Sequence, residues 1–196
     1  MKTKLLLPVL LFVLTFINAQ EKNWNFESNY TIVPGDGLFG EDNFVDVGVK
    51  YRFAKIGIFH LGFGINGGFS RVNVENTGFE SRTDDTYLIQ PRLFTEFQIP
   101  GFSKLRPSLG LGYSFVNTIT DVTFSNGSED SNGVWNQGFN FNLGVSYDIS
   151  KRFFVQAQYD FVDLTPEDDT PDTIQFIGPS FNGNINNIRL GIGFRF

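Results

Sequence analysis

The chain contains no cysteine, one histidine and one methionine among its 196 residues. Without cysteine, neither a disulfide framework nor a thiolate metal site is possible. Basic residues are also in the minority, with 15 lysines and arginines against 21 aspartates and glutamates. A nucleic-acid partner is therefore not expected, because the phosphates of nucleic acids require a basic surface. Beyond the first twenty residues the sequence shows no helical hydrophobic periodicity, so it predicts an all-β protein.

The first nineteen residues have the pattern of a secretory signal peptide. Lys2 and Lys4 precede an apolar run at residues 5–17, and the small residue Ala19 follows it. The run is shorter than the roughly 20 residues that a membrane-spanning helix needs. We therefore predict that residues 1–19 are removed and that residues 20–196 form a single exported domain. The exported chain keeps 13 of the 15 basic residues and all 21 acidic residues, a formal charge of −8.

The last eleven residues alternate strictly between an apolar face and a polar face. The apolar face consists of Ile188, Leu190, Ile192, Phe194 and Phe196. Arginine, glycine and asparagine occupy the positions between them. Successive side chains of a strand point to opposite faces, and this pattern is typical of a strand with lipid on one side and a polar barrel interior on the other. The segment also resembles the C-terminal assembly-signal strand of bacterial outer-membrane barrels, which typically ends in phenylalanine.

The same alternation recurs along the chain and predicts eight strands. They lie at residues 22–32, 43–53, 58–73, 86–99, 105–123, 134–149, 152–164 and 186–196. Three short turns, near Lys55, Ser103 and Ser150, alternate with four longer loops, among them a solvated loop at residues 125–133 and an acidic loop at residues 165–183. Short periplasmic turns and longer extracellular loops characterise outer-membrane barrels. We predict an eight-stranded antiparallel up-and-down transmembrane β-barrel.

A secreted barrel of the lipocalin type has the same number of strands and the same hairpin topology. Its apolar face would have to point inward, and its charged face would have to meet water. Here the polar face is rich in glycine, for example at Gly62, Gly64 and Gly110, while the apolar face is wide and aromatic. This distribution favours the membrane barrel.

The inward faces of the predicted strands carry six basic and five acidic side chains. They are Glu27, Asp46, Lys50, Arg52, Arg92, Glu96, Arg106, Asp148, Asp160, Arg189 and Arg195. The interior of an eight-stranded barrel is just wide enough to be filled by side chains, and charges buried there must be paired or hydrogen-bonded. Two interpretations follow, a structural salt-bridge network that closes the lumen and a gated path for protons or ions.

Catalytic and metal-binding patterns are weak. His60 could act as a general base, but it is predicted near a periplasmic turn and facing inward, without the nucleophile and carboxylate of a triad. The run of Glu167, Asp168, Asp169 and Asp172 offers oxygen ligands for Ca²⁺, yet its spacing matches no calcium motif and is typical of a solvated loop. We therefore expect no enzyme activity, no catalytic residue, no cofactor and no resident metal.

The whole exported chain resembles small outer-membrane β-barrels of the OmpA/OmpX type, particularly those of Bacteroidetes-like bacteria. The resemblance rests on the predicted signal peptide that ends at residues 18–20, on the eight amphipathic strands and on the terminal residues 194–196. The resemblance implies residence in the bacterial outer membrane. It also implies contact with membrane lipid and lipopolysaccharide, and insertion by the barrel-assembly machinery through the C-terminal strand. Two functions remain open: a scaffold that presents acidic loops for adhesion or envelope integrity, and an OmpW-like narrow channel for small or hydrophobic solutes.

Overall fold

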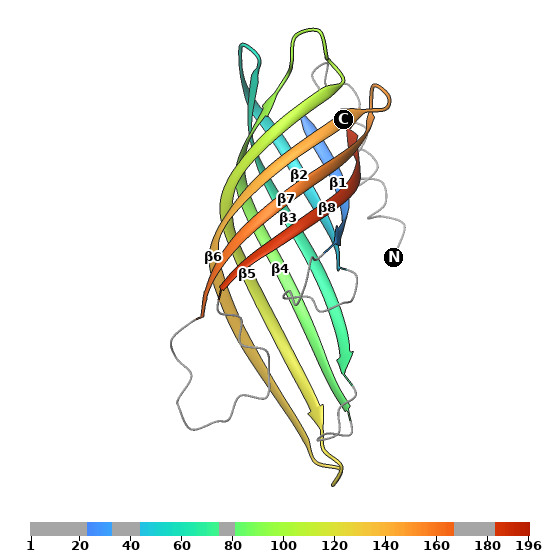
Figure 1. Ribbon diagram of the computed structural model, residues 1–196, viewed down its shortest axis with the longest axis vertical. Helices are drawn as coiled ribbons and strands as arrows, with labels where there is room; N and C mark the ends of the chain where they lie inside the picture. The colour runs from blue at the N-terminus through green and yellow to red at the C-terminus, as the bar shows by residue number, and fades with distance from the viewer. Residues whose placement is uncertain (1–22, 33–43, 75–80, 167–182) are drawn as a thin grey trace, which may run out of the picture.

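A computed structural model describes residues 23–32, 44–74, 81–166 and 183–196. These residues form a closed barrel in which every strand pairs antiparallel with its sequence neighbour and β1 also pairs with β8 (Figure 1). The strands are β1 (Trp24–Ile32), β2 (Phe44–Ile56), β3 (Phe59–Val74), β4 (Ser81–Phe97), β5 (Leu105–Thr123), β6 (Glu129–Asp148), β7 (Phe153–Pro166) and β8 (Gly183–Arg195). The predicted fold class is confirmed. The predicted signal peptide lies outside the described residues.

Burial along each strand follows the sequence alternation. In β1, Glu27 and Asn29 are buried while Phe26 and Tyr30 are 47% and 42% exposed. Comparable apolar side chains cover the outer wall of all eight strands. A contiguous apolar surface of this breadth is not stable in water, so the outer face of the barrel is its lipid-facing side. Within the described residues, no helix is long and apolar enough to cross a membrane.

Aromatic pairs mark the two edges of the lipid-facing band. Phe59 and Phe97 lie edge to face at 5.1 Å near the short turns, and Phe69 and Tyr87 lie 5.1 Å apart toward the opposite end. Phe59 and Phe69 are ten positions apart on β3. At about 3.3 Å per residue and a tilt of about 45°, that separation spans about 23 Å across the bilayer. The apolar band of outer-membrane barrels is about 25 Å tall, so these rings lie at its two interfaces.

Strands β3 to β6 continue well beyond the Phe69–Tyr87 pair. β4, β5 and β6 contain 17, 19 and 20 residues, whereas β1 contains nine. Their pairing extends to Ser81↔Thr123 and Thr123↔Glu129. The long strands therefore form a four-stranded sheet that projects from the extracellular end, at the bottom of the view in Figure 1. We call this part the protruding sheet.

The solvated loop predicted at residues 125–133 is shorter in the structure, so its predicted extent is wrong. Residues 129–133 belong to β6 and pair with the end of β5, and the turn is confined to the segment between Phe124 and Ser128. Asn126 Oδ1 accepts a hydrogen bond from the Ser128 amide at 2.9 Å, and Gly127 supplies a φ of 78°. Pairing with the β-branched end of β5 outweighs the weak strand propensity of this polar segment.

The end of β2 also differs from the prediction. A turn was expected at residues 54–57, but the strand continues to Ile56. Its register with β3 shifts between Arg52 and Ala54, and pairing resumes after the shift. Such a shift is a β-bulge, which inserts one extra residue into a strand. The chain then reverses at Gly57, whose φ is +62°. In the same way, β4 begins at Ser81 rather than at residue 86.

The lumen is not polar throughout, contrary to the prediction. At its extracellular end, five apolar side chains from four strands form a buried cluster, with Ile185 packed against it: Phe44, Leu88, Val116, Val162 and Leu164. Two further rings, Phe94 and Phe154, point inward in the periplasmic half. Phe94 lies opposite Gly62, where a Cβ would come within 2.3 Å of its ring. We call the five-residue group the apolar cluster.

Candidate functional site

The eleven charged residues singled out in the sequence all line the lumen, where they form two groups. The central network consists of Glu27, Asp46, Lys50, Arg92, Asp160 and Arg189. The mouth network, at the periplasmic end, consists of Arg52, Glu96, Arg106, Asp148 and Arg195. Every strand except β3 contributes to at least one of the two groups, so each group depends on the closure of the barrel.

The central network is organised around Arg189, whose side chain is fully buried. Its guanidinium forms ion pairs with Asp46 at 3.1 Å and with Asp160, and it donates to Gln90 Oε1 at 2.6 Å. Arg92 reaches the same Asp160 carboxylate at 2.8 Å. Lys50 pairs separately with Glu27 at 2.8 Å. Three cations therefore meet three carboxylates, and the six described side chains of the central network carry no net charge together.

Uncharged amides complete the central network, and sequence reasoning did not assign them to it. Asn29 donates to Asp46 at 2.7 Å, Asn66 donates to Glu27 at 3.1 Å, and Asn142 donates to Asp160 at 2.5 Å. Arg92 Nε donates to Asn140 at 2.9 Å. A buried carboxylate requires such donors in addition to its cation. Period-2 alternation places these amides on the inner face, but their partners depend on strand register.

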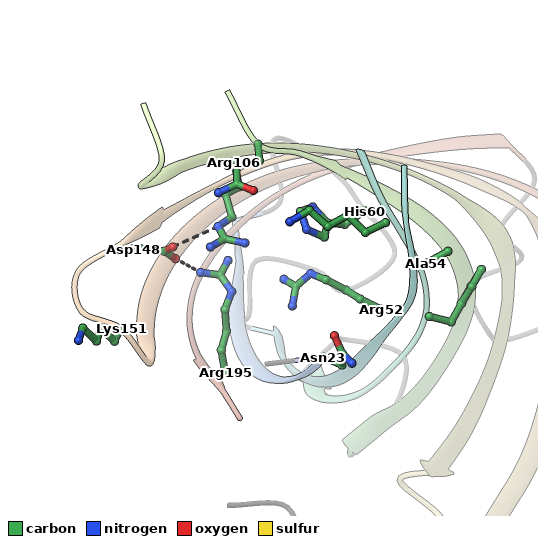
Figure 2. Close-up of a pocket in the computed structure, with 11 residues that line it drawn as sticks. Asn23, Arg52, Ala54, His60, Arg106, Asp148, Lys151 and Arg195 are labelled. Carbon is green, nitrogen blue, oxygen red and sulfur yellow. Dashed lines mark hydrogen bonds and ion pairs between the residues drawn. The ribbon is translucent and has the colours of Figure 1, made fainter. Parts of the chain in front are cut away.

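The mouth network has fewer carboxylates than cations. Glu96 bridges Arg52 at 2.7 Å and Arg106 at 3.1 Å. Asp148 bridges Arg106 at 3.1 Å and Arg195. Beside these groups lies a cavity of about 360 Å³, which Figure 2 shows opening among Arg52, Arg106, Arg195 and His60. Two carboxylates are shared among three guanidinium groups.

His60 faces this cavity, as predicted for the inner face of the third strand (Figure 2). Its Nδ1 is buried and has no hydrogen-bond partner in the part of the chain that the structure describes. Its neighbours in the cavity include the guanidinium groups of Arg52 and Arg106. A triad requires the histidine to be hydrogen-bonded to both a nucleophile and a carboxylate, and the described residues place no such pair on His60.

The opposite end of the molecule is acidic. On the outer face of the protruding sheet, Arg71 binds Asp85 through two hydrogen bonds of 2.6 Å, which hold the pKa of the Asp85 carboxyl below its usual range. Asp121, Glu129 and Asp130 are exposed nearby. Among the described residues, no three potential ligands gather as a metal site. The acidic run at residues 167–172 lies outside the described residues.

Comparison with solved structures identifies other small outer-membrane barrels. The attachment invasion locus protein Ail of Yersinia pestis, in complex with sucrose octasulfate, has a TM-score of 0.55 and 16% identity, over 89% of this chain and 97% of Ail. Neisserial surface protein A has a TM-score of 0.50 and 14% identity, over 90% and 98% of the two chains. OprG of Pseudomonas aeruginosa has a TM-score of 0.50 and 14% identity, over 89% and 95%.

These likenesses, at 14–16% identity, concern the fold alone. The comparison with curated proteins finds no match. A sequence model described as outer membrane protein beta-barrel domain matches residues 9–196. The match confirms the predicted family and the bacterial outer membrane as its location, while the narrower Bacteroidetes-type assignment stays a prediction. The chain belongs to the outer membrane protein beta-barrel domain family.

Proposed function

We propose that this protein is a non-enzymatic and non-conducting scaffold that holds an acidic β-sheet above the outer membrane for contact with other surfaces. The observation that carries the proposal is the filled lumen. Arg189 is linked to carboxylates on β2 and β7, and Arg92 on β4 reaches the same β7 carboxylate. These side chains cross-link several walls of the barrel at mid-height. The apolar cluster lies between them and the extracellular end.

Both barriers oppose ion flow for physical reasons. An ion that crosses the central network must displace buried and mutually paired charges, and removing one partner of such a pair costs about 3–5 kcal/mol. An ion that crosses the apolar cluster must lose its hydration among Phe44, Leu88 and Val116. A static barrel with both barriers in series is closed to hydrated solutes.

The protruding sheet supports the display role. Beyond Asn136↔Pro166, residues 129–135 of β6 pair with β5 on one side, and no described strand pairs with them on the other. An open strand edge of this kind can accept a strand from a partner. The acidic side chains of the sheet favour a positively charged partner. The likeness to the attachment invasion locus protein concerns the fold and supports this role by analogy.

Refolded protein is expected to be silent in a planar bilayer at all moderate voltages of either sign. A heat-shift gel first establishes that the barrel is folded. A known porin, added afterwards to the same membrane, serves as the positive control for conductance. Discrete and reproducible openings of the folded protein would contradict the scaffold and favour the alternative, an OmpW-like narrow channel.

Trimming the protruding sheet tests the display role. Ile119 and Gly133 are cross-strand partners, so an Asn-Gly turn can replace residues 120–132 and close a two-residue hairpin. Cells that carry the trimmed protein are expected to bind a polylysine-coated surface no better than cells that lack the protein. Binding by the full-length protein is expected to fall as salt rises, because salt screens exposed charges. Unchanged binding by a trimmed protein that still passes the heat-shift assay would refute the display role.

A further inference from the structure

The cavity at the periplasmic mouth has a strongly basic lining. Among the described residues, five cationic side chains border it, together with His60 and one carboxylate, Asp148. The cationic side chains are Arg52, Lys55, Arg106, Lys151 and Arg195. Most of the cavity surface is polar, and the three arginines project into it from the walls of β2, β5 and β8 (Figure 2). The lining therefore differs from the charge-balanced centre of the lumen.

Among the described side chains of the lumen, the excess of positive charge lies at this end of the barrel. The central network pairs three cations with three carboxylates, whereas in the mouth network three guanidinium groups form ion pairs with two carboxylates of the described residues, Glu96 and Asp148. Lys55 adds a further cation at the rim of the cavity. Cations held close together in a partly enclosed space repel one another, and an anion between them would relieve that repulsion.

Two side-chain nitrogen atoms without protein hydrogen-bond partners lie in the same region. Arg195 Nε and His60 Nδ1 are buried and have no hydrogen-bond partner among the described residues. The Arg195 side chain is held in place by the Phe154 ring, which lies 4.2 Å from its guanidinium carbon, and by Ser146 at 3.0 Å. Arg106 is positioned by its bonds to Glu96 and Asp148. The cations are therefore preorganised, which lowers the entropic cost of binding a ligand.

We propose that the periplasmic mouth of the barrel is a binding site for a phosphate-bearing anion, with Arg106 and Arg195 as its principal ligands. A guanidinium group presents a planar set of donors that matches the oxygens of a phosphate. A cavity of about 360 Å³ accommodates a phosphate group with a small substituent. Lys55, at the rim, attracts the anion from the periplasm.

Two sources can supply this chemistry. One is a small soluble phosphate compound of the periplasm. The other is the headgroup of an anionic phospholipid in the inner leaflet, which meets the same rim of the barrel. The shared ligand is the phosphate group, and the two sources can be tested separately.

The single histidine of the chain gives a direct readout, because His60 lies in the cavity and produces one imidazole signal. Mature barrel without an affinity tag, labelled with ¹⁵N-histidine and refolded in zwitterionic micelles, is titrated with inorganic phosphate at constant pH and constant ionic strength. We expect a saturable shift of the His60 signal. Chloride at the same ionic strength is expected to leave the signal unchanged.

Two substitutions localise the site. Arg106→Gln is expected to weaken phosphate binding about tenfold, the loss typical of one charged hydrogen-bonding group. Lys55→Gln removes a rim cation that lies outside the mouth network, and it is expected to weaken binding by a smaller factor while leaving the network intact. Lys104→Gln is the matched control, since it removes an exposed charge at the same end of the barrel but outside the cavity lining. It should leave the affinity unchanged.

The lipid arm repeats the measurement with short-chain phosphatidylglycerol, and with phosphatidylcholine of the same chain length as its control. A saturable shift with phosphatidylglycerol and none with inorganic phosphate would support the site and identify the headgroup as its ligand. A shift with inorganic phosphate supports a soluble ligand. The proposal is overturned if neither ligand saturates, if chloride produces the same shift, or if Lys104→Gln weakens binding as much as Lys55→Gln. The comparison of Lys55→Gln with Lys104→Gln remains decisive even if Arg106→Gln does not fold.

Discussion

Replacement of Arg189 by glutamine is expected to lower the free energy of unfolding by about 3–5 kcal/mol, the range found when one partner of a buried ion pair is removed. Arg189 is fully buried and lies between the carboxylates of Asp46 and Asp160. Without the Arg189 guanidinium, Arg92 alone would have to neutralise the carboxylates of Asp46 and Asp160. The measurement is equilibrium urea unfolding in lipid bilayers, followed by tryptophan fluorescence.

A double variant separates lost charge balance from lost packing. Arg189→Gln combined with Asp46→Asn restores equal numbers of cations and carboxylates in the central network, so it should be more stable than Arg189→Gln alone. Lys104→Gln, at an exposed position of a periplasmic turn, should change stability by no more than about 0.5 kcal/mol. If Arg189→Gln proves as mild as Lys104→Gln, the central network does not stabilise the barrel.

Replacement of Gly138 by alanine is expected to destabilise the barrel by about 1–3 kcal/mol or more, as overpacking of a close-packed interior does. A Cβ on Gly138 would lie 1.7 Å from the Asp163 carbonyl oxygen and 2.9 Å from Leu164 Cα. Both atoms belong to the backbone of β7, so a side-chain rotation cannot relieve the contact. The substitution must separate β6 from β7 beside the apolar cluster. Urea unfolding and the heat-shift gel both report the effect.

Gly110 provides the matched control, because it is also a buried strand glycine. A Cβ there would lie no closer than 3.4 Å to any neighbour, and that neighbour is the Asn142 side chain. Gly110→Ala is therefore expected to be neutral, or to stabilise by up to about 1 kcal/mol through the smaller entropy of the unfolded chain. If Gly138→Ala and Gly110→Ala change the stability equally, the close approach of β6 and β7 is not the reason for a glycine at position 138.

The two halves of the lumen differ in a way that bears on both proposals. The centre and the extracellular end are occupied by paired charges and apolar side chains, which supports a closed scaffold. The periplasmic mouth keeps an open cavity and an excess of cations. The phosphate site does not depend on the display role, because the binding experiment detects it in isolated protein and the adhesion experiment concerns the opposite end of the barrel.

Some boundaries could not be read from residue type. Residues 129–133 are polar and include a glycine, features typical of a loop, yet they form part of β6 because β5 offers them a complete set of backbone partners. Leu88, Val116 and Val162 follow the inward phase of their strands, so alternation did contain the signal for the apolar cluster. The predicted lumen residues were confined to charged side chains, so these apolar positions were left out.

The sequence by itself determined the strand faces, the number of strands, the closed antiparallel fold and the identity of the charged residues that line the lumen. These follow from period-2 geometry, which is a local property of an extended chain and needs no knowledge of its neighbours. Only the tertiary structure decided which charges meet. The ion pairs of Arg189 with Asp46 and Asp160 connect residues from three strands. They depend on the closure of the barrel and on the register of its strands. The division into a neutral centre and a basic mouth has the same cause, because it depends on the height of each side chain along a tilted strand.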